Sequence, residues 1–158
     1  MQTVYIETTI PSYLGAHPSR QEPMATHQKK THEWWNTERH KFLLYSSLLV
    51  RQEASCGNED AARRRMLYLN GIVELDVLPA TDKLEADLIR LFQLPPRAAA
   101  DAGHLAMAIL HRMDYLLTLN CTHLANAKLQ KDLMEYCHYH RLHVPIVCTP
   151  ETLNTLIL

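Results

Sequence analysis

Three acidic residues far apart in the chain, Glu7, Glu53 and Asp101, are the residues most able to do chemistry together. Each either ends a run typical of a strand or shares the apolar face of a helical pattern. A carboxylate that faces a core is tolerated only beside hydrogen-bond donors or a cation. We therefore expect the three acids to meet at a divalent-metal site. Mg²⁺ or Mn²⁺ fits best because both ions prefer carboxylate and water oxygens.

Asp101 and Glu53 each share a predicted helix face with apolar residues. Leu105 and Ile109 lie four and eight positions after Asp101, and Leu49 lies four positions before Glu53. These spacings place both carboxylates on buried stripes, and Asp101 stands near a helix N-terminus, where the dipole favours an acid. Taken singly, each has another interpretation: an early-turn Asp bound by backbone amides, or a solvated Glu.

Glu7 and Asn120 end two predicted strands, at the edge where open parallel sheets bind ligands. Thr8 and Thr9 follow Glu7 directly. They could start the next helix, orient the Glu7 carboxylate by hydrogen bonds, or contact substrate. Asn120 either forms a turn or acts as an outer ligand through a metal-bound water.

Short β-rich segments alternate with helical patterns along the chain. The predicted strands cover residues 3–6, 42–46, 72–78, 115–119 and 145–148. Parallel strands need crossover connections, and helices supply them. The alternation predicts an α/β protein with three layers and a mostly parallel sheet of about five strands. With 158 residues, 47% of them hydrophobic, one domain spanning residues 1–158 is expected.

The polar segment 21–41 predicts a long, partly exposed helix that could dock a partner. Trp34 and Trp35 point in different directions on any helix, so we expect one in the core and the other at an interface. The cysteines form no C-x-x-C pair, and buried reduced thiols are expected for all of them. They are Cys56, Cys121, Cys137 and Cys148.

Charge and composition limit the classes of function. The formal net charge is −1, so no global basic field indicates a nucleic-acid partner. The arginines 63–65 follow Glu59 and Asp60 at helix-pair spacing, which favours a solvated, ion-paired face over phosphate contact. Four glycines are too few for either nucleotide-binding loop considered, G-x-G-x-x-G or Walker. No long apolar run or secretory leader is evident, so we expect a cytoplasmic protein with no membrane association.

Four segments in this order and spacing resemble the PIN domain, and within it the VapC-like toxins of bacterial type II toxin-antitoxin systems. The resemblance spans nearly the whole chain. It rests on Tyr5-Ile6-Glu7-Thr8-Thr9, Gln52-Glu53-Ala54-Ser55, Asp101-Ala102-Gly103-His104-Leu105-Ala106 and Asp114-Tyr115-Leu116-Leu117-Thr118-Leu119-Asn120.

The resemblance implies a three-layer PIN-like fold and a metal-dependent ribonuclease that hydrolyses RNA phosphodiester bonds. Glu7, Glu53 and Asp101 would occupy its acidic positions and Asn120 the fourth, with Mg²⁺ or Mn²⁺ as cofactor. His104, one turn beyond Asp101, would support the site or contact RNA, against the alternative of a structural histidine. A homodimer and a cognate antitoxin are also implied.

Two residues depart from the family pattern. Position 7 is typically Asp in the family, whereas Glu7 is one methylene longer, and Gly103 stands inside a helix where relatives carry a larger residue. Both departures favour a second interpretation. In it the chain is a catalytically weak or degenerate PIN-like domain that binds RNA or a protein.

Overall fold

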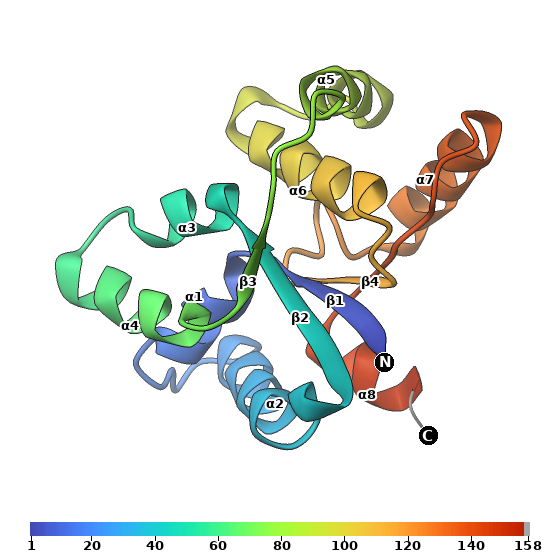
Figure 1. Cartoon of the computed structure of the whole chain (residues 1–158). Helices are drawn as coiled ribbons and strands as arrows, with labels where there is room; N and C mark the ends of the chain where they lie inside the picture. The colour runs from blue at the N-terminus through green and yellow to red at the C-terminus, as the bar shows by residue number, and fades with distance from the viewer. Residues whose placement is uncertain (157–158) are drawn as a thin grey trace.

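A five-stranded parallel sheet forms the centre of the protein in the computed structural model, which describes residues 1–156 (Figure 1). The strand order is β3-β2-β1-β4-β5, and every neighbouring pair is parallel. The strands are β1 (Gln2–Ile6), β2 (Phe42–Ser47), β3 (Val73–Leu75), β4 (Tyr115–Leu117) and β5 (Ile146–Cys148). The α-helices are α1 (Thr9–Gly15), α2 (Met24–Thr37), α3 (Leu48–Ala54), α4 (Glu59–Leu69), α5 (Thr81–Phe92), α6 (Ala99–Leu110), α7 (Ala127–Tyr139) and α8 (Pro150–Leu156).

Helices cover both faces of the sheet, which confirms the predicted three-layer α/β class. Alternate residues of one strand enter different cores: Val4 and Ile6 pack with α1, α2 and α8, whereas Tyr5 packs with α3, α5, α6 and α7. Figure 1 shows the two helical layers on opposite sides of the strands. Because strands covered on both faces are apolar where they are buried, residues 4–6 of β1 and the whole of β4 are continuous hydrophobic runs. Within residues 1–156, none of the helices has the length and apolarity needed to cross a bilayer.

The parallel connections bring several chain segments to one edge of the sheet. Glu7 follows the carboxyl end of β1, and α3 starts directly after β2, where Ser47 caps it by accepting a hydrogen bond from Val50 N. Helix α6 leads into β4 and therefore starts at this same edge, with Asp101 in its first turn. The ends of β1 and β4 and the starts of α1, α3 and α6 therefore lie at this edge.

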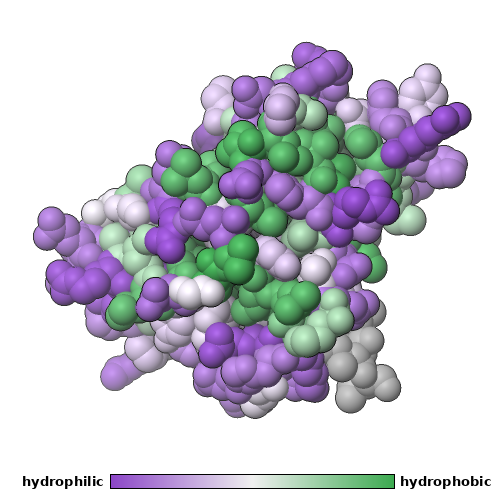
Figure 2. Space-filling model, in the orientation of Figure 1, coloured by the Kyte–Doolittle hydropathy of each residue, from purple (hydrophilic) through white to green (hydrophobic). Residues whose placement is uncertain are grey.

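Some boundaries differ from the prediction. The third strand was expected over residues 72–78, but β3 ends at Leu75, because its register partner Ser47 is the last residue of β2 before the chain turns into α3. Figure 2 shows apolar side chains gathered over the middle of the face on which β2 and β3 lie in Figure 1. The exposed apolar residues of these two strands are Leu43 and Val73.

Two expectations about individual side chains were wrong. Both Trp34 and Trp35 are buried, because α2 meets two neighbours: Trp34 stacks on Phe42, and Trp35 meets the edge of Tyr68. Two of the four cysteines are buried and two are exposed. Burial raises the pKa of Cys137 to about 11 and that of Cys148 to about 12, as expected of core thiols, but Cys56 and Cys121 are exposed.

Gly103 marks a close approach between α6 and α3. A Cβ atom at this position would lie 2.8 Å from Leu49 Cδ2 and 3.5 Å from Glu85 Oε2. The glycine therefore lets α3, which carries Glu53, lie directly against α6, which carries Asp101. A larger residue would have to displace the end of the Leu49 side chain, because protein interiors are closely packed.

We predict that Gly103→Leu lowers the free energy of unfolding by about 1–3 kcal/mol, because overpacking forces neighbouring side chains from their rotamers. Urea titration followed by circular dichroism measures this change. The double variant Gly103→Leu with Leu49→Ala should recover part of the lost stability, because removal of the Leu49 side chain makes room for the new leucine. Equal stability of Gly103→Leu and the wild type would contradict the close approach.

Candidate functional site

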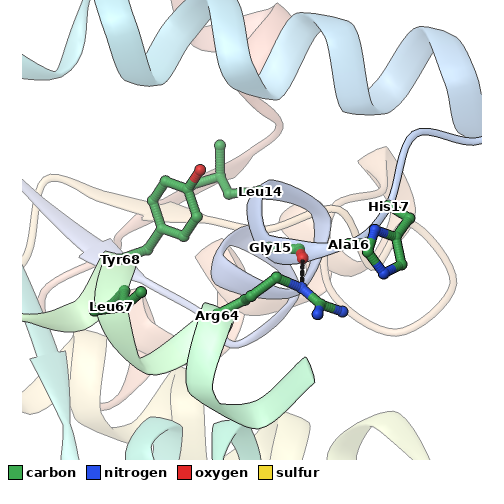
Figure 3. A pocket seen from close by; sticks show the side chains of 7 residues that line it. All are labelled: Leu14, Gly15, Ala16, His17, Arg64, Leu67 and Tyr68. Atoms are coloured by element: carbon green, nitrogen blue, oxygen red, sulfur yellow. Dashed lines mark hydrogen bonds between the residues drawn. The ribbon is translucent and has the colours of Figure 1, made fainter. Parts of the chain in front are cut away.

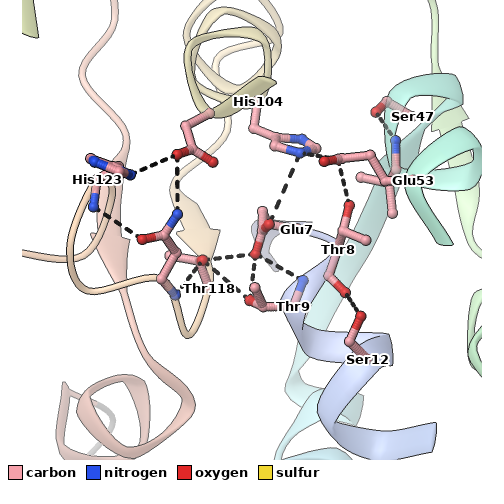
Figure 4. Close-up of polar contacts among 12 residues, drawn as sticks. Glu7, Thr8, Thr9, Ser12, Ser47, Glu53, His104, Thr118 and His123 are labelled. Carbon is pink, nitrogen blue, oxygen red and sulfur yellow. Dashed lines mark hydrogen bonds and ion pairs between the residues drawn. The ribbon is translucent and has the colours of Figure 1, made fainter. Parts of the chain in front are cut away.

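The predicted acids meet at the carboxyl edge of the sheet, and their exposure to solvent increases from Glu7 through Asp101 to Glu53. The side chain of Glu7 is 5% exposed, that of Asp101 14% and that of Glu53 35%. Figure 4 shows Glu7 in the middle of the polar network, between Glu53 and His104 on one side and Thr118 and His123 on the other. The acids therefore line a site that is closed at Glu7 and opens toward Glu53.

The Glu7 carboxylate is held through one of its oxygens. Oε2 accepts hydrogen bonds from the backbone N–H of Thr9 at 3.0 Å, from the Thr9 hydroxyl, and from the Thr118 hydroxyl at 2.7 Å. Of the three roles considered for Thr8 and Thr9, the structure shows two for Thr9: it starts α1 and it orients Glu7. Thr118 also accepts from Asn120 N at 3.0 Å, which links the ends of β1 and β4. Oε1 of Glu7 remains directed toward His104, 4.0 Å from Nε2.

Glu53 is fixed through its Oε1 oxygen. Thr8 donates its hydroxyl hydrogen to this atom at 2.7 Å, and His104 Nε2 lies 2.6 Å from it. Burial by itself raises the pKa of Glu53, but the hydrogen bond and charge of His104, with the Thr8 hydroxyl, outweigh burial and hold the pKa below its ordinary value. Glu53 is therefore ionised at neutral pH.

His104 stands inside the protein, with no exposed surface. Its Nδ1 lies 2.8 Å from the Tyr5 hydroxyl, which in turn lies 2.7 Å from Ser47 Oγ. Burial lowers the pKa of His104, but the bond to Glu53 and the negative charges of Glu7, Glu53 and Asp101 reverse this effect and raise it. As an imidazolium, His104 donates to Glu53 through Nε2 and to Tyr5 through Nδ1. It supports the site, and its burial excludes the direct RNA contact considered above.

Asp101 is bound on the other side of the site. Its Oδ2 accepts a hydrogen bond from Asn120 Nδ2 at 3.1 Å and lies 3.4 Å from His123 Nδ1. The Asn120 Oδ1 accepts from His123 N at 3.0 Å, so both ends of this amide are occupied. Burial and the charge of Glu7 raise the pKa of Asp101. Asn120 thus forms a turn and orients Asp101; a direct role in metal binding stays a prediction.

The three carboxylates share one arrangement, in which one oxygen of each is held by protein donors. Within the described part of the chain, Glu7 Oε1, Glu53 Oε2 and Asp101 Oδ1 accept no hydrogen bond. Glu7 and Asp101 also repel each other, as the raised pKa of Asp101 shows. In donor chemistry and charge this set fits Mg²⁺ or Mn²⁺.

The acids are nevertheless not arranged as a finished metal site. In residues 1–156, no group of three Asp, Glu, His or Cys side chains stands in a position to hold one ion. In the structure Glu53 Oε1 lies 2.6 Å from His104 Nε2, and Asp101 Oδ2 accepts a hydrogen bond from Asn120 Nδ2.

Four residues of the network were not singled out as site residues from the sequence. Thr118 and His123 lie around Asn120, and a polar Thr followed by Asn-x-x-His at a strand end is a signal that could have found them. Tyr5 lay in a predicted strand and Ser47 directly after one. A buried tyrosine hydroxyl needs a partner, but its partner His104 is 99 residues away, and the sequence alone does not identify it.

No protein-family description matches the chain, and a search of the curated proteins finds no match.

Removal of the His104 charge should change the pH dependence of stability. We predict that His104→Gln, in metal-free protein, lowers the free energy of unfolding by about 1–3 kcal/mol near pH 6, because buried hydrogen bonds are lost. The pKa of His104 is raised in the folded state above 6.5, so its contribution is complete below about pH 6.5 and is lost as the pH rises through the folded-state pKa. The difference from the wild type should therefore shrink as the pH rises.

Urea titrations from about pH 6 to pH 9 test this prediction. His138→Gln serves as the control, because His138 is exposed at the end of α7 and its loss should leave stability nearly unchanged. A wild-type advantage that stays constant over this pH range would show that His104 is neutral in the folded protein.

Proposed function

We propose that the protein is a Mg²⁺- or Mn²⁺-dependent ribonuclease of the PIN type. The observation that carries the proposal is the arrangement of Glu7, Glu53 and Asp101, which are each fixed through one oxygen and carry a second, unbonded oxygen at the carboxyl edge of a parallel sheet. Parallel α/β sheets place ligand sites at this edge. The resemblance of the four sequence segments to PIN domains supplies the substrate class, RNA.

In this proposal the three carboxylates bind the ion, and neighbouring donors restrict where they can move. Thr9 and Thr118 fix Glu7, Thr8 and His104 fix Glu53, and Asn120 with His123 fixes Asp101. The chemistry supplied by a bound Mg²⁺ or Mn²⁺ is Lewis acidity toward water and the phosphate oxygens, which favours in-line hydrolysis. None of the protein side chains acts as a nucleophile in this mechanism.

His123 is suited to meet the RNA. Its side chain is 25% exposed, and it stands beside Asp101, 3.4 Å from Oδ2. A ring nitrogen in this position could donate a hydrogen bond to a phosphate oxygen. The buried His104, by contrast, acts only through Glu53 and Tyr5.

The biological setting we propose is that of a type II toxin. The chain would act in the cytoplasm as a homodimer inhibited by a small cognate antitoxin. The exposed apolar side chains on β2 and β3 support an interface with a second copy. A small antitoxin gene beside the gene for this chain would support this setting.

A second function, a PIN-like module that binds RNA or a protein without cutting it, has one observation in its favour. His104 Nε2 lies 2.6 Å from Glu53 and 4.0 Å from Glu7. A protonated His104 would therefore place a cation among the acids and balance part of their charge without a metal ion. The two functions therefore differ in whether a divalent ion binds and whether RNA is cut.

We predict that the purified protein cleaves single-stranded RNA in Mg²⁺ or Mn²⁺, and that EDTA abolishes cleavage. Asp101→Asn should reduce the rate by more than about 100-fold, since loss of even an outer partner of a metal site costs about 10–100-fold. The readout is gel electrophoresis of a labelled RNA. Asp132→Asn on α7 is the matched control, because Asp132 pairs with Lys128 on the surface. Cleavage that survives both EDTA and Asp101→Asn would rule out the proposed site.

Metal binding can be measured without activity. We predict that Mn²⁺ binds the chelator-treated protein in isothermal titration calorimetry, and that Glu7→Gln weakens binding by more than about tenfold. At about 100 times the dissociation constant, Mn²⁺ should add about 2.7 kcal/mol to the free energy of unfolding. RNA binding without Mn²⁺ binding or cleavage would favour the non-catalytic module.

A further inference from the structure

A cavity of about 370 Å³ lies between the end of α1 and helix α4, away from the acids (Figure 3). Leu14, Leu67 and Tyr68 give it an apolar wall, and His17 and Arg64 give it polar groups. Its volume is at the small end of the range of ligand pockets. A pocket of this size suits one nucleoside-sized group rather than several side chains of a peptide.

Two polar groups of the cavity have unused hydrogen-bonding capacity. Arg64 donates its Nε hydrogen to Gly15 O at 2.6 Å, which fixes the guanidinium and leaves its terminal nitrogens free. Within the described residues Arg64 has no carboxylate partner, and the Tyr68 hydroxyl makes no hydrogen bond. Arg63 beside it forms the surface ion pair expected from the sequence, with Asp60 at 3.4 Å. The expectation of an ion-paired face therefore holds for Arg63 and was wrong for Arg64 and for Arg65, which donates to the backbone carbonyls of Ala54 and Cys56.

The cavity is connected to the acidic site through two segments. Helix α1 starts at Thr9, which binds Glu7, and ends at Gly15 in the cavity wall. On the other side, Arg65 of α4 donates to Ala54 O at 2.9 Å, directly after Glu53. Six residues of α-helix extend about 9 Å. This length corresponds to the rise of about three stacked nucleotides.

The geometry points to a nucleotide-binding subsite in this cavity, which holds one base of a single-stranded RNA whose backbone continues to the acids. Arg64 contacts a phosphate with its terminal nitrogens. The base lies against Leu14, Leu67 and the Tyr68 ring, and the Tyr68 hydroxyl meets a polar base edge. The inference rests on the proposed ribonuclease function and extends it, because it states how the RNA is placed relative to the cleavage site.

The chemistry of the cavity favours a nucleotide over an acidic peptide. An apolar wall with one fixed guanidinium matches a base joined to a phosphate, which combines a flat apolar surface with a negative charge. Gly15 keeps the two walls close: a Cβ there would lie 3.1 Å from Arg65 N and 3.2 Å from Arg64 C. Both walls are therefore set by backbone packing, so the subsite is formed before RNA arrives.

The test measures binding of a fluorescein-labelled single-stranded RNA of about eight nucleotides by anisotropy, in EDTA so that no cleavage occurs. Arg64→Ala should weaken binding by about tenfold or more, and the slope of log affinity against log salt should fall by about one. Arg63→Ala is the matched control and should change affinity by less than about twofold, because Arg63 is an exposed, ion-paired surface residue.

A second pair of variants guards against a folding effect of Arg64→Ala. Leu67 is 68% exposed, so Leu67→Asp places a negative charge at the cavity with little structural cost, and it should also weaken RNA binding. Met134→Asp on α7, where Met134 is 53% exposed, makes the same charge change elsewhere and should have little effect. Thermal unfolding confirms that all four variants are folded.

The outcomes separate this inference from the proposed function. If the wild type cleaves RNA while Arg64→Ala and Leu67→Asp keep its affinity and KM, the subsite is wrong and the ribonuclease stands. If binding depends on Arg64 but the wild type never cleaves, the subsite stands and the ribonuclease is wrong. Undiminished RNA binding by the variants, with loss of binding to an acidic peptide, would assign the cavity to a protein and overturn the inference.

Discussion

The hydrogen bond between His104 and Glu53 is the interaction on which the site depends. Three carboxylates lie at one sheet edge, and burial together with the negative charge of Glu7 raises the pKa of Asp101. When it is protonated, His104, which is fully buried and 2.6 Å from Glu53, offsets part of this charge from inside the protein. Tyr5 completes the arrangement, because its hydroxyl binds the other ring nitrogen and fixes the ring. The acids can thus lie together in the folded chain before any ligand binds.

This interaction also explains why the site allows two functions. Glu53 Oε1 is bound by His104 and Thr8, so a divalent ion would have to use the other oxygen or move the side chain. The site can act as a ribonuclease if the ion binds Glu53 and, at the same time, keeps its own position relative to Asp101. A non-catalytic module results if the imidazolium is the only cation that the acids bind. The balance is electrostatic, between one fixed internal charge and one exchangeable external charge.

The same helices position both the acids and the cavity. Helix α1 joins Glu7 at one end to Gly15 at the other, and Arg65 joins α4 to the residue after Glu53. Gly103 and Gly15 let helices approach closely where a Cβ would collide. Because these contacts involve packed backbone, a ligand at the cavity and a ligand at the acids would be held in a fixed relation, which a cut at a defined phosphate requires.

The sequence by itself determined the fold class, because apolar strands alternating with helical patterns leave few arrangements other than a parallel sheet with two helical layers. It also placed Glu7, Glu53, Asp101 and Asn120 at one edge, since the carboxyl ends of parallel strands meet there. Tertiary structure alone decided which oxygen of each acid is bound, that both tryptophans are buried, and that Arg64 differs from Arg63. These features depend on contacts between residues distant in the chain, such as Tyr5 with His104, and local periodicity carries no information about such pairs.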